Sequence, residues 1–148
     1  LRVFISSESE LPKELKKFQI NVPAEQMHNA LAFAQLFVGE SSTMASESAV
    51  LGTPTIYIND SQLGYTNDCD KYGLLYSYTG SGENQLAAIK KAEELSLKQN
   101  TKEEYLPKRE KLLADKIDVS AFLIWFVENY PESVKEVKAK DFDFGRFK

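Results

Sequence analysis

Residues 38–58 constrain the fold more than any other stretch, because they join two apolar runs through a helix with clear start and stop signals. Residues 36–38 form a short apolar run, as in a strand buried on both faces. The hydroxyl residues at positions 41–43 are of types preferred at helix N-caps. Gly52 can adopt the left-handed conformation that closes a helix, and Pro54 prevents its continuation. The stretch therefore predicts a strand, a helix and a second, parallel strand.

The turn between the first strand and the helix is a candidate anion site. A parallel strand-helix-strand unit places that turn at the carboxyl edge of the sheet, where open α/β folds bind ligands. Free amides and the positive end of the helix dipole favour an anion there, most often a phosphate.

Glu47 is the unusual residue of this helix. If Ser42 or Thr43 is the N-cap, a capping box requires its carboxylate at position 45 or 46, so Glu47 comes too late. Its small neighbours leave space for the carboxylate to accept both hydrogens of a cis-diol, such as that of a ribose. The alternative is a solvated helix glutamate. Leu51, one helical turn later, is expected to be buried beneath the Gly52 stop.

Residues 39–54 read Gly-Glu-Ser-Ser-Thr-Met-Ala-Ser-Glu-Ser-Ala-Val-Leu-Gly-Thr-Pro. This motif resembles the C-terminal nucleotide-sugar domain of GT-B fold enzymes, which include UDP-N-acetylglucosamine 2-epimerases and many glycosyltransferases. It is most similar to the domain of unknown function 354 family. The resemblance implies that the turn Ser41-Ser42-Thr43 holds a pyrophosphate and that Glu47 holds the ribose. Ser42 and Thr43 stand where the epimerases have glycines. Their hydroxyls can donate hydrogen bonds to the phosphate in place of the bare backbone that glycine exposes.

The remaining pattern predicts one α/β domain over residues 1–148, with a doubly wound parallel sheet like the C-terminal half of a GT-B fold. Its strands are expected at residues 3–5, 20–22, 36–38, 55–58 and 74–76. The polar stretch 59–73 lacks periodicity and predicts a long loop at the carboxyl edge that binds a ligand or closes over it.

Residues 83–148 are predicted to form a helical C-terminal extension, with helices at 85–97, 102–115 and 116–130. The centre of the last helix, residues 121–127, is apolar all round, but it is too short to cross a bilayer, so no transmembrane segment is expected. We expect it to be buried on two sides and ended by Pro131. The alternative is an exposed surface, or one paired with another copy of the chain in a homo-oligomer.

Three further residues are candidates for contacts with a sugar or a phosphate. His28, on the helix before residue 36, is placed to donate into the cleft; the alternative is a structural or solvated histidine. Asp60 and Gln62 lie in the loop where GT-B donors bind their sugar hydroxyls. With one histidine and with Cys69 as the one cysteine, neither a metal site nor a bound cofactor is expected.

Composition and charge bear on the partners and the location of the protein. The net charge of −4 and the lack of a basic block argue against a nucleic-acid partner. A single cysteine fits a reducing compartment, so a cytoplasmic location is expected. The sequence starts within a predicted strand and without methionine, which indicates a piece of a longer chain. By the resemblance, the missing partner is an N-terminal α/β half.

Two functions follow as hypotheses. The first is the half of a glycosyltransferase or sugar-nucleotide 2-epimerase that binds UDP-sugar or a similar donor, in surface polysaccharide synthesis. The catalytic residues would then lie in the other half, and this part would be inactive alone. The second is a non-catalytic binding or assembly domain on a Rossmann-like scaffold.

Overall fold

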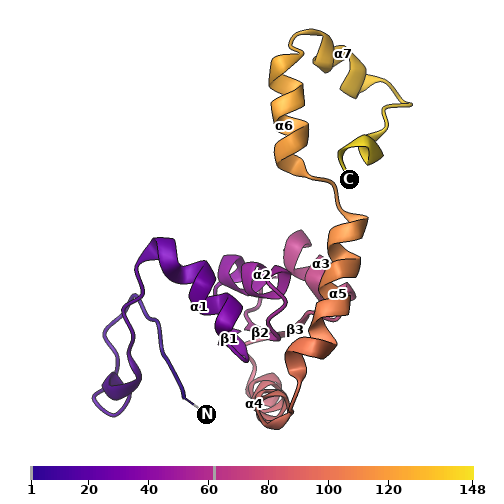
Figure 1. The fold of residues 1–148 in the computed structure, drawn as a ribbon. Coiled ribbons are helices and arrows are strands. Elements are labelled where there is room, and N and C mark those ends of the chain that lie inside the picture. Colours follow the sequence, from indigo (N-terminus) through magenta and orange to yellow (C-terminus); the bar gives the residue numbers. More distant parts are fainter. Residues whose placement is uncertain (1, 62) are drawn as a thin grey trace. The chain divides into compact units, whose positions relative to one another are not determined.

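The computed structural model describes residues 2–61 and 63–148 (Figure 1). The chain forms two compact units. The first, Leu1–Arg109, contains the β-sheet and is called the sheet unit. The second, Glu110–Lys148, is helical and is called the C-terminal unit.

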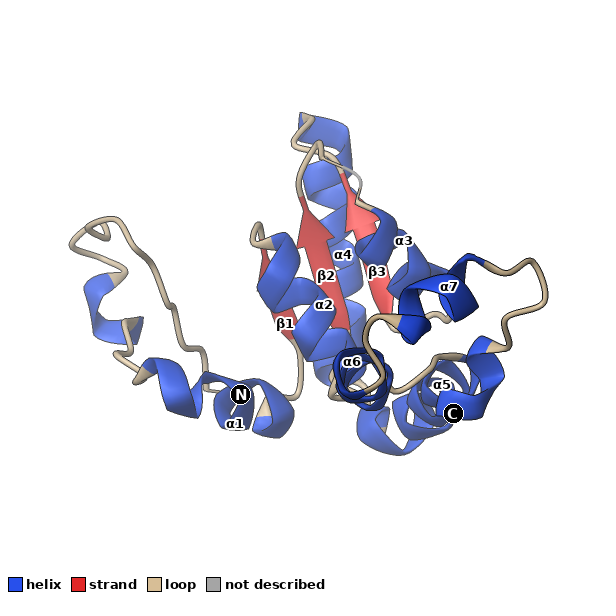
Figure 2. Cartoon of the chain, turned by 90° about the horizontal axis from the view of Figure 1, so that it is seen from above, coloured by secondary structure: helices blue, strands red, loops and turns tan. Residues whose placement is uncertain are grey.

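The sheet has three parallel strands, β1 (Phe37–Gly39), β2 (Thr55–Ile58) and β3 (Leu75–Tyr78), in the order β1-β2-β3. Each strand is followed by a helix, namely α2 (Ser42–Val50), α3 (Gly64–Lys71) or α4 (Gly82–Leu97). Helices α2 and α3 cover one face of the sheet and α4 covers the other (Figures 1 and 2). The predicted α/β class with a parallel sheet is confirmed.

The central strand β2 accounts for this layering. Ile56 is fully buried and packs with Ala88 and Leu95 of α4. Because side chains alternate along a strand, Tyr57 points to the opposite face, where α2 lies. The residues of α2 at the core are small or polar, and Ala45 and Ala49 have no exposed surface. This permits the helix to lie close to the strands.

The predicted stop after α2 is confirmed. Gly52 has φ +85°, the left-handed conformation that glycine adopts without a steric penalty. The amide of Gly52 donates to the carbonyl of Ala49 (2.9 Å). Next to it, the buried hydroxyl of Thr53 donates to the carbonyl of Leu31 at 2.8 Å. This bond ties helix α1 (Met27–Phe33) to the start of β2.

The first two predicted strands are wrong as members of the sheet. Among the described residues, this region has only an isolated parallel bridge between Ile5 and Gln19. Val3 and Phe4 are exposed. Two short 3-10 helices, η1 (Lys16–Phe18) and η2 (Ala24–Gln26), complete the region before α1.

The predicted long loop at residues 59–73 is also wrong, because α3 occupies most of it. Thr66 closes the first turn of this helix: its hydroxyl donates to the carbonyl of Leu63 (2.9 Å) and accepts from the amide of Leu63 (3.3 Å). Among the described residues of α3, only Thr66 and Cys69 are buried. Because so few side chains of α3 are buried, the sequence shows no apolar residues repeating at helical spacing in this stretch.

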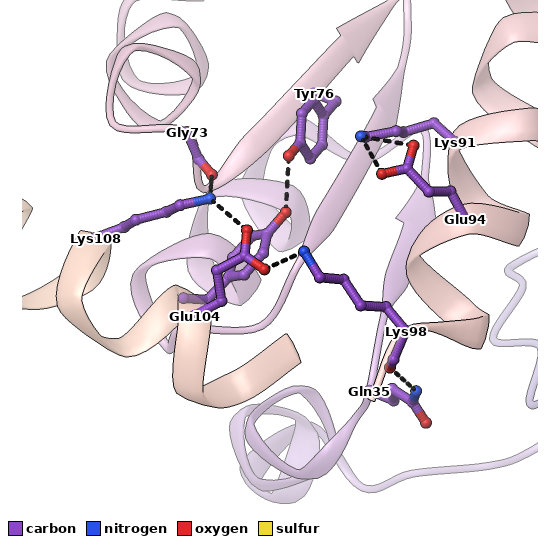
Figure 3. Close-up of polar contacts among 9 residues, drawn as sticks. Gln35, Gly73, Tyr76, Lys91, Glu94, Lys98, Glu104 and Lys108 are labelled. Carbon is purple, nitrogen blue, oxygen red and sulfur yellow. Dashed lines mark hydrogen bonds and ion pairs between the residues drawn. The ribbon is translucent and has the colours of Figure 1, made fainter. Parts of the chain in front are cut away.

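Helix α5 (Thr101–Asp115) is joined to β3 by polar contacts that Figure 3 shows. The buried Tyr105 donates its hydroxyl hydrogen to the Tyr76 hydroxyl at 3.0 Å, and the Lys108 ammonium donates to the carbonyl of Gly73 at 3.2 Å. Glu104 pairs with both Lys98 and Lys108. The hydrogen bond from Lys98 lowers the pKa of the Glu104 carboxyl, and burial raises the pKa of the Tyr105 hydroxyl.

The C-terminal unit contains α6 (Val119–Glu128), α7 (Glu132–Lys138) and the 3-10 helix η3 (Phe144–Phe147). Helix α6 begins three residues later than predicted, because Asp118 caps it by accepting from the amide of Ala121 (2.9 Å). It ends at Glu128, before Pro131, and α7, which was not predicted, follows.

An aromatic cluster holds this unit together. Phe122 and Trp125 of α6 pack against the last aromatic residues of the chain, Phe142, Phe144 and Phe147. The other side of α6 is not buried: Leu123, Ile124 and Val127 are 53–70% exposed, so the expectation of burial on two sides was wrong. Within residues 2–61 and 63–148, no helix has both the length and the apolar character needed to span a bilayer.

Candidate functional site

The carboxyl ends of β1, β2 and β3 lie at one edge of the sheet, and α2, α3 and α4 begin there (Figure 2). The loops at this edge are tied together. The Asn59 amide side chain, just after β2, donates to the carbonyl of Glu40 after β1 (3.1 Å). The backbone amide of Gly80, after β3, donates to the Asp60 carboxylate (2.9 Å). The predicted ligand-binding edge is therefore a set of mutually braced loops.

The predicted anion turn lies at the start of α2. Ser41 is the N-cap, and its hydroxyl oxygen accepts from the amide of Met44 at 3.4 Å. The N-cap is thus one residue before Ser42 and two before Thr43, the N-caps considered for a capping box. The amides of Ser42 and Thr43 belong to the first turn, where no preceding helical carbonyl can accept them. The Ser42 hydroxyl accepts from the hydroxyl of Tyr65 in α3 at 3.0 Å.

Glu47 and His28 lie together, although they come from different helices. The Nε2 of His28 in α1 is 3.3 Å from the Oε2 of Glu47 in α2. The imidazole side chain is 64% exposed, while the Glu47 side chain is only 38% exposed. Glu47 is therefore partly exposed and lies beside an imidazole.

An open hollow of about 450 Å³ adjoins this pair. It is lined by His28, Ser46, Glu47, Val50 and Leu51. Leu51 is half-buried and lines the hollow, so it is not the buried residue expected from the sequence. The Ser46 hydroxyl is engaged, donating to the carbonyl of Thr43 (2.9 Å). The surface that bounds the hollow is mainly apolar, although Glu47 and His28 are among the residues that line it.

Asp60 and Gln62 are the other candidate residues from the sequence. Asp60 holds the turn at Gly80, and among the described residues no hydrogen bond or ion pair joins it to Glu47 or His28. Gln62 lies outside the residues that the structure describes. In the part of the chain that is described, no three His, Cys, Asp or Glu side chains gather as metal ligands.

Sequence reasoning missed two residues of this edge. Tyr65 lies in the stretch that was predicted as a loop. Its hydroxyl reaches Ser42 because this stretch forms helix α3. Asn59 directly follows a strand, which is where polar residues of a parallel sheet edge occur, so its position was the available signal.

Comparison with known proteins finds no matching family model, no matching curated protein and no matching solved structure.

Proposed function

We propose that the sheet unit is the donor-binding half of a GT-B glycosyltransferase or sugar-nucleotide 2-epimerase that acts in surface polysaccharide synthesis in the cytoplasm. Its sheet would then be one part of a doubly wound, Rossmann-like domain. The ligand would be a UDP-sugar or a similar nucleotide-sugar. The observation that carries the proposal is the turn at Ser41, which lies at the carboxyl edge of a parallel sheet and opens a helix of nine residues.

The pyrophosphate would bind at this turn. The amides of Ser42 and Thr43 and the positive end of α2 favour an anion. Serine and threonine hydroxyls add donors that the glycines of the epimerases do not have. Helix dipole and hydroxyls would offset the pyrophosphate charge without a bound metal.

The ribose would bind at Glu47. Its carboxylate lies farther along the same helix and adjoins an open hollow, so the diol can reach it from solvent. Catalytic groups are expected in a second α/β half. We therefore expect this chain to bind nucleotide without turnover.

Titration calorimetry with UDP tests the proposal, with the parent and Glu47→Gln compared. Loss of a charged acceptor should weaken UDP binding by about 1.5–3 kcal/mol. Glu93→Gln is the matched control, because it removes the same charge from the exposed surface of α4. Amide spectra of the parent should shift at Ser42 and Thr43. Equal UDP affinity in Glu47→Gln and the parent, with no shift at this turn, would contradict the proposal.

The second candidate function is a non-catalytic binding or assembly domain. The observation that favours it is the exposed apolar surface of α6, formed by Leu123, Ile124 and Val127. Sedimentation velocity over a range of concentrations distinguishes the two functions. Self-association without UDP binding supports assembly, and UDP binding by a species of constant mass supports the donor-binding function.

A further inference from the structure

We propose that His28 is a positioning residue for Glu47, so that a ribose cis-diol is received by a carboxylate held between two helices. The inference rests on the proposed function and deepens it. It assigns a role to a residue of α1, which lies outside the motif of residues 39–54.

The first step is that α1 is a fixed platform for His28. The buried Thr53 hydroxyl donates to the carbonyl of Leu31, in the turn of α1 that follows His28. Leu31 itself is buried, with 5% of its surface exposed. These contacts anchor α1 to the segment between α2 and β2. The position of the α1 backbone that carries His28 is therefore set by buried contacts, while the imidazole itself is exposed.

The second step is that the contact restricts Glu47. A free glutamate side chain loses rotamer freedom when it orders on a ligand, and that loss weakens binding. The Oε2 of Glu47 lies 3.3 Å from the Nε2 of His28, so the imidazole is the neighbour that favours this orientation of the carboxylate before a ligand arrives. A carboxylate has two acceptor oxygens with several lone pairs, so it can still accept from a diol while it faces the imidazole.

The third step is that fold stability does not explain the pair. Ion pairs between side chains as exposed as these contribute little to the free energy of folding. A purely structural role predicts that substitution of His28 lowers stability and leaves ligand discrimination unchanged, and a solvated histidine predicts no change in either. A positioning role predicts unchanged folding and altered discrimination.

The experiment compares UDP with 2′-deoxy-UDP, which lacks one hydroxyl of the diol, by titration calorimetry on the 148-residue chain. In the parent, UDP should bind more tightly than 2′-deoxy-UDP. His28→Ala should weaken UDP binding by about 2- to 10-fold, the loss expected for one polar contact. It should change 2′-deoxy-UDP binding less, so the affinity ratio falls. His28→Gln, which keeps a donor of similar reach, should retain more of the ratio than His28→Ala.

Asn29→Ala is the matched control, because Asn29 is exposed on the same helix and its side chain donates to Gln26. Circular dichroism should show all variants folded. A ratio unchanged in His28→Ala but lowered in Glu47→Gln would overturn the role of His28 and leave the proposed function standing. A parent that binds neither nucleotide, or that binds both equally with Glu47→Gln unchanged, would overturn the proposed function and this inference together.

Discussion

Tyr105 makes a polar contact between its own buried hydroxyl and the hydroxyl of a second tyrosine, Tyr76. It is fully buried, and its hydroxyl donates to that of Tyr76 at 3.0 Å. Tyr105→Phe should lower the free energy of unfolding by about 0.5–1.5 kcal/mol, because the Tyr76 hydroxyl loses its donor. Urea denaturation measures this. Tyr65→Phe should cost less, since water can replace its exposed bond to Ser42, and an equal loss in both variants would contradict the argument.

Glu104 should make stability depend on acid pH. The hydrogen bond from Lys98, with the nearby charge of Lys108, holds the pKa of its carboxyl below the ordinary 4.5. A lowered folded-state pKa stabilises the fold above the ordinary value, and this contribution is lost as the pH falls through the lowered pKa. Glu104→Gln should therefore lower stability at pH 7 and flatten the loss of stability on acidification.

Urea denaturation at several pH values measures the effect of Glu104. Glu103→Gln, on the exposed surface of the same helix, is the control. Parallel pH profiles for the parent and Glu104→Gln would show that the carboxylate contributes no pH-dependent stability.

Some residues of the candidate site could be predicted from the sequence, and others could not. The start and stop signals of a helix are local in sequence. The sequence therefore predicted hydroxyl residues at the start of α2 and Glu47 within the helix, counted back from the stop at Gly52. The contact between His28 and Glu47 depends on how α1 crosses α2, which is a matter of packing between residues far apart in sequence.

Among the elements, the end of α2 depends on the conformation of Gly52. At φ +85°, a side chain is strained, and an added Cβ would lie 3.1 Å from the Cδ of Arg109. Gly52→Ala should lower the free energy of unfolding by about 1–2 kcal/mol. Gly82→Ala is the contrasting variant: it lies at the start of α4, where an added Cβ meets no atom within 4 Å. It should leave stability unchanged or raise it, and similar losses in both would refute the conformational argument.

Elements were predictable where burial leaves a pattern. The strands β1, β2 and β3 are short runs rich in apolar residues, and their approximate positions were predicted correctly. Strand β2 is almost wholly buried, whereas Val38 of β1 is 48% exposed, so the expectation of a strand buried on both faces at residues 36–38 was wrong. Residues 3–5 have the same β-branched and aromatic character, but a strand also needs a lateral partner, and sequence composition does not supply one. Helix α3 was missed for the opposite reason, since its exposed residues are mainly polar.

At the scale of the whole molecule, we expect the C-terminal unit to unfold independently of the sheet unit, because its own aromatic cluster holds it together. Phe122 contacts four other rings, with centroids 5.4–6.1 Å away. Phe122→Ala should raise hydrogen exchange in α6 and α7 while β2 stays protected, because small units open locally. Leu123→Ala, on the exposed side of α6, should change exchange little. Loss of protection in β2 together with α6 would indicate one cooperative unit.

The boundary between the units was not evident in the sequence. The composition becomes helical at residue 83, yet α4 packs on the sheet through Ala88 and Leu95. The units divide after Arg109, within α5. A shift from strand to helix patterns marks a change of secondary structure, and the packing partner of each helix decides which unit it joins.

The aromatic cluster also determines what an optical experiment can detect. Trp125 is the only tryptophan of the chain, and the Arg146 guanidinium lies 3.9 Å from the centroid of its ring. Selective excitation of indole fluorescence therefore reports on the surroundings of this one ring in α6. An emission change on adding a nucleotide would register an event at that ring, and a silent titration would not by itself exclude binding at the start of α2.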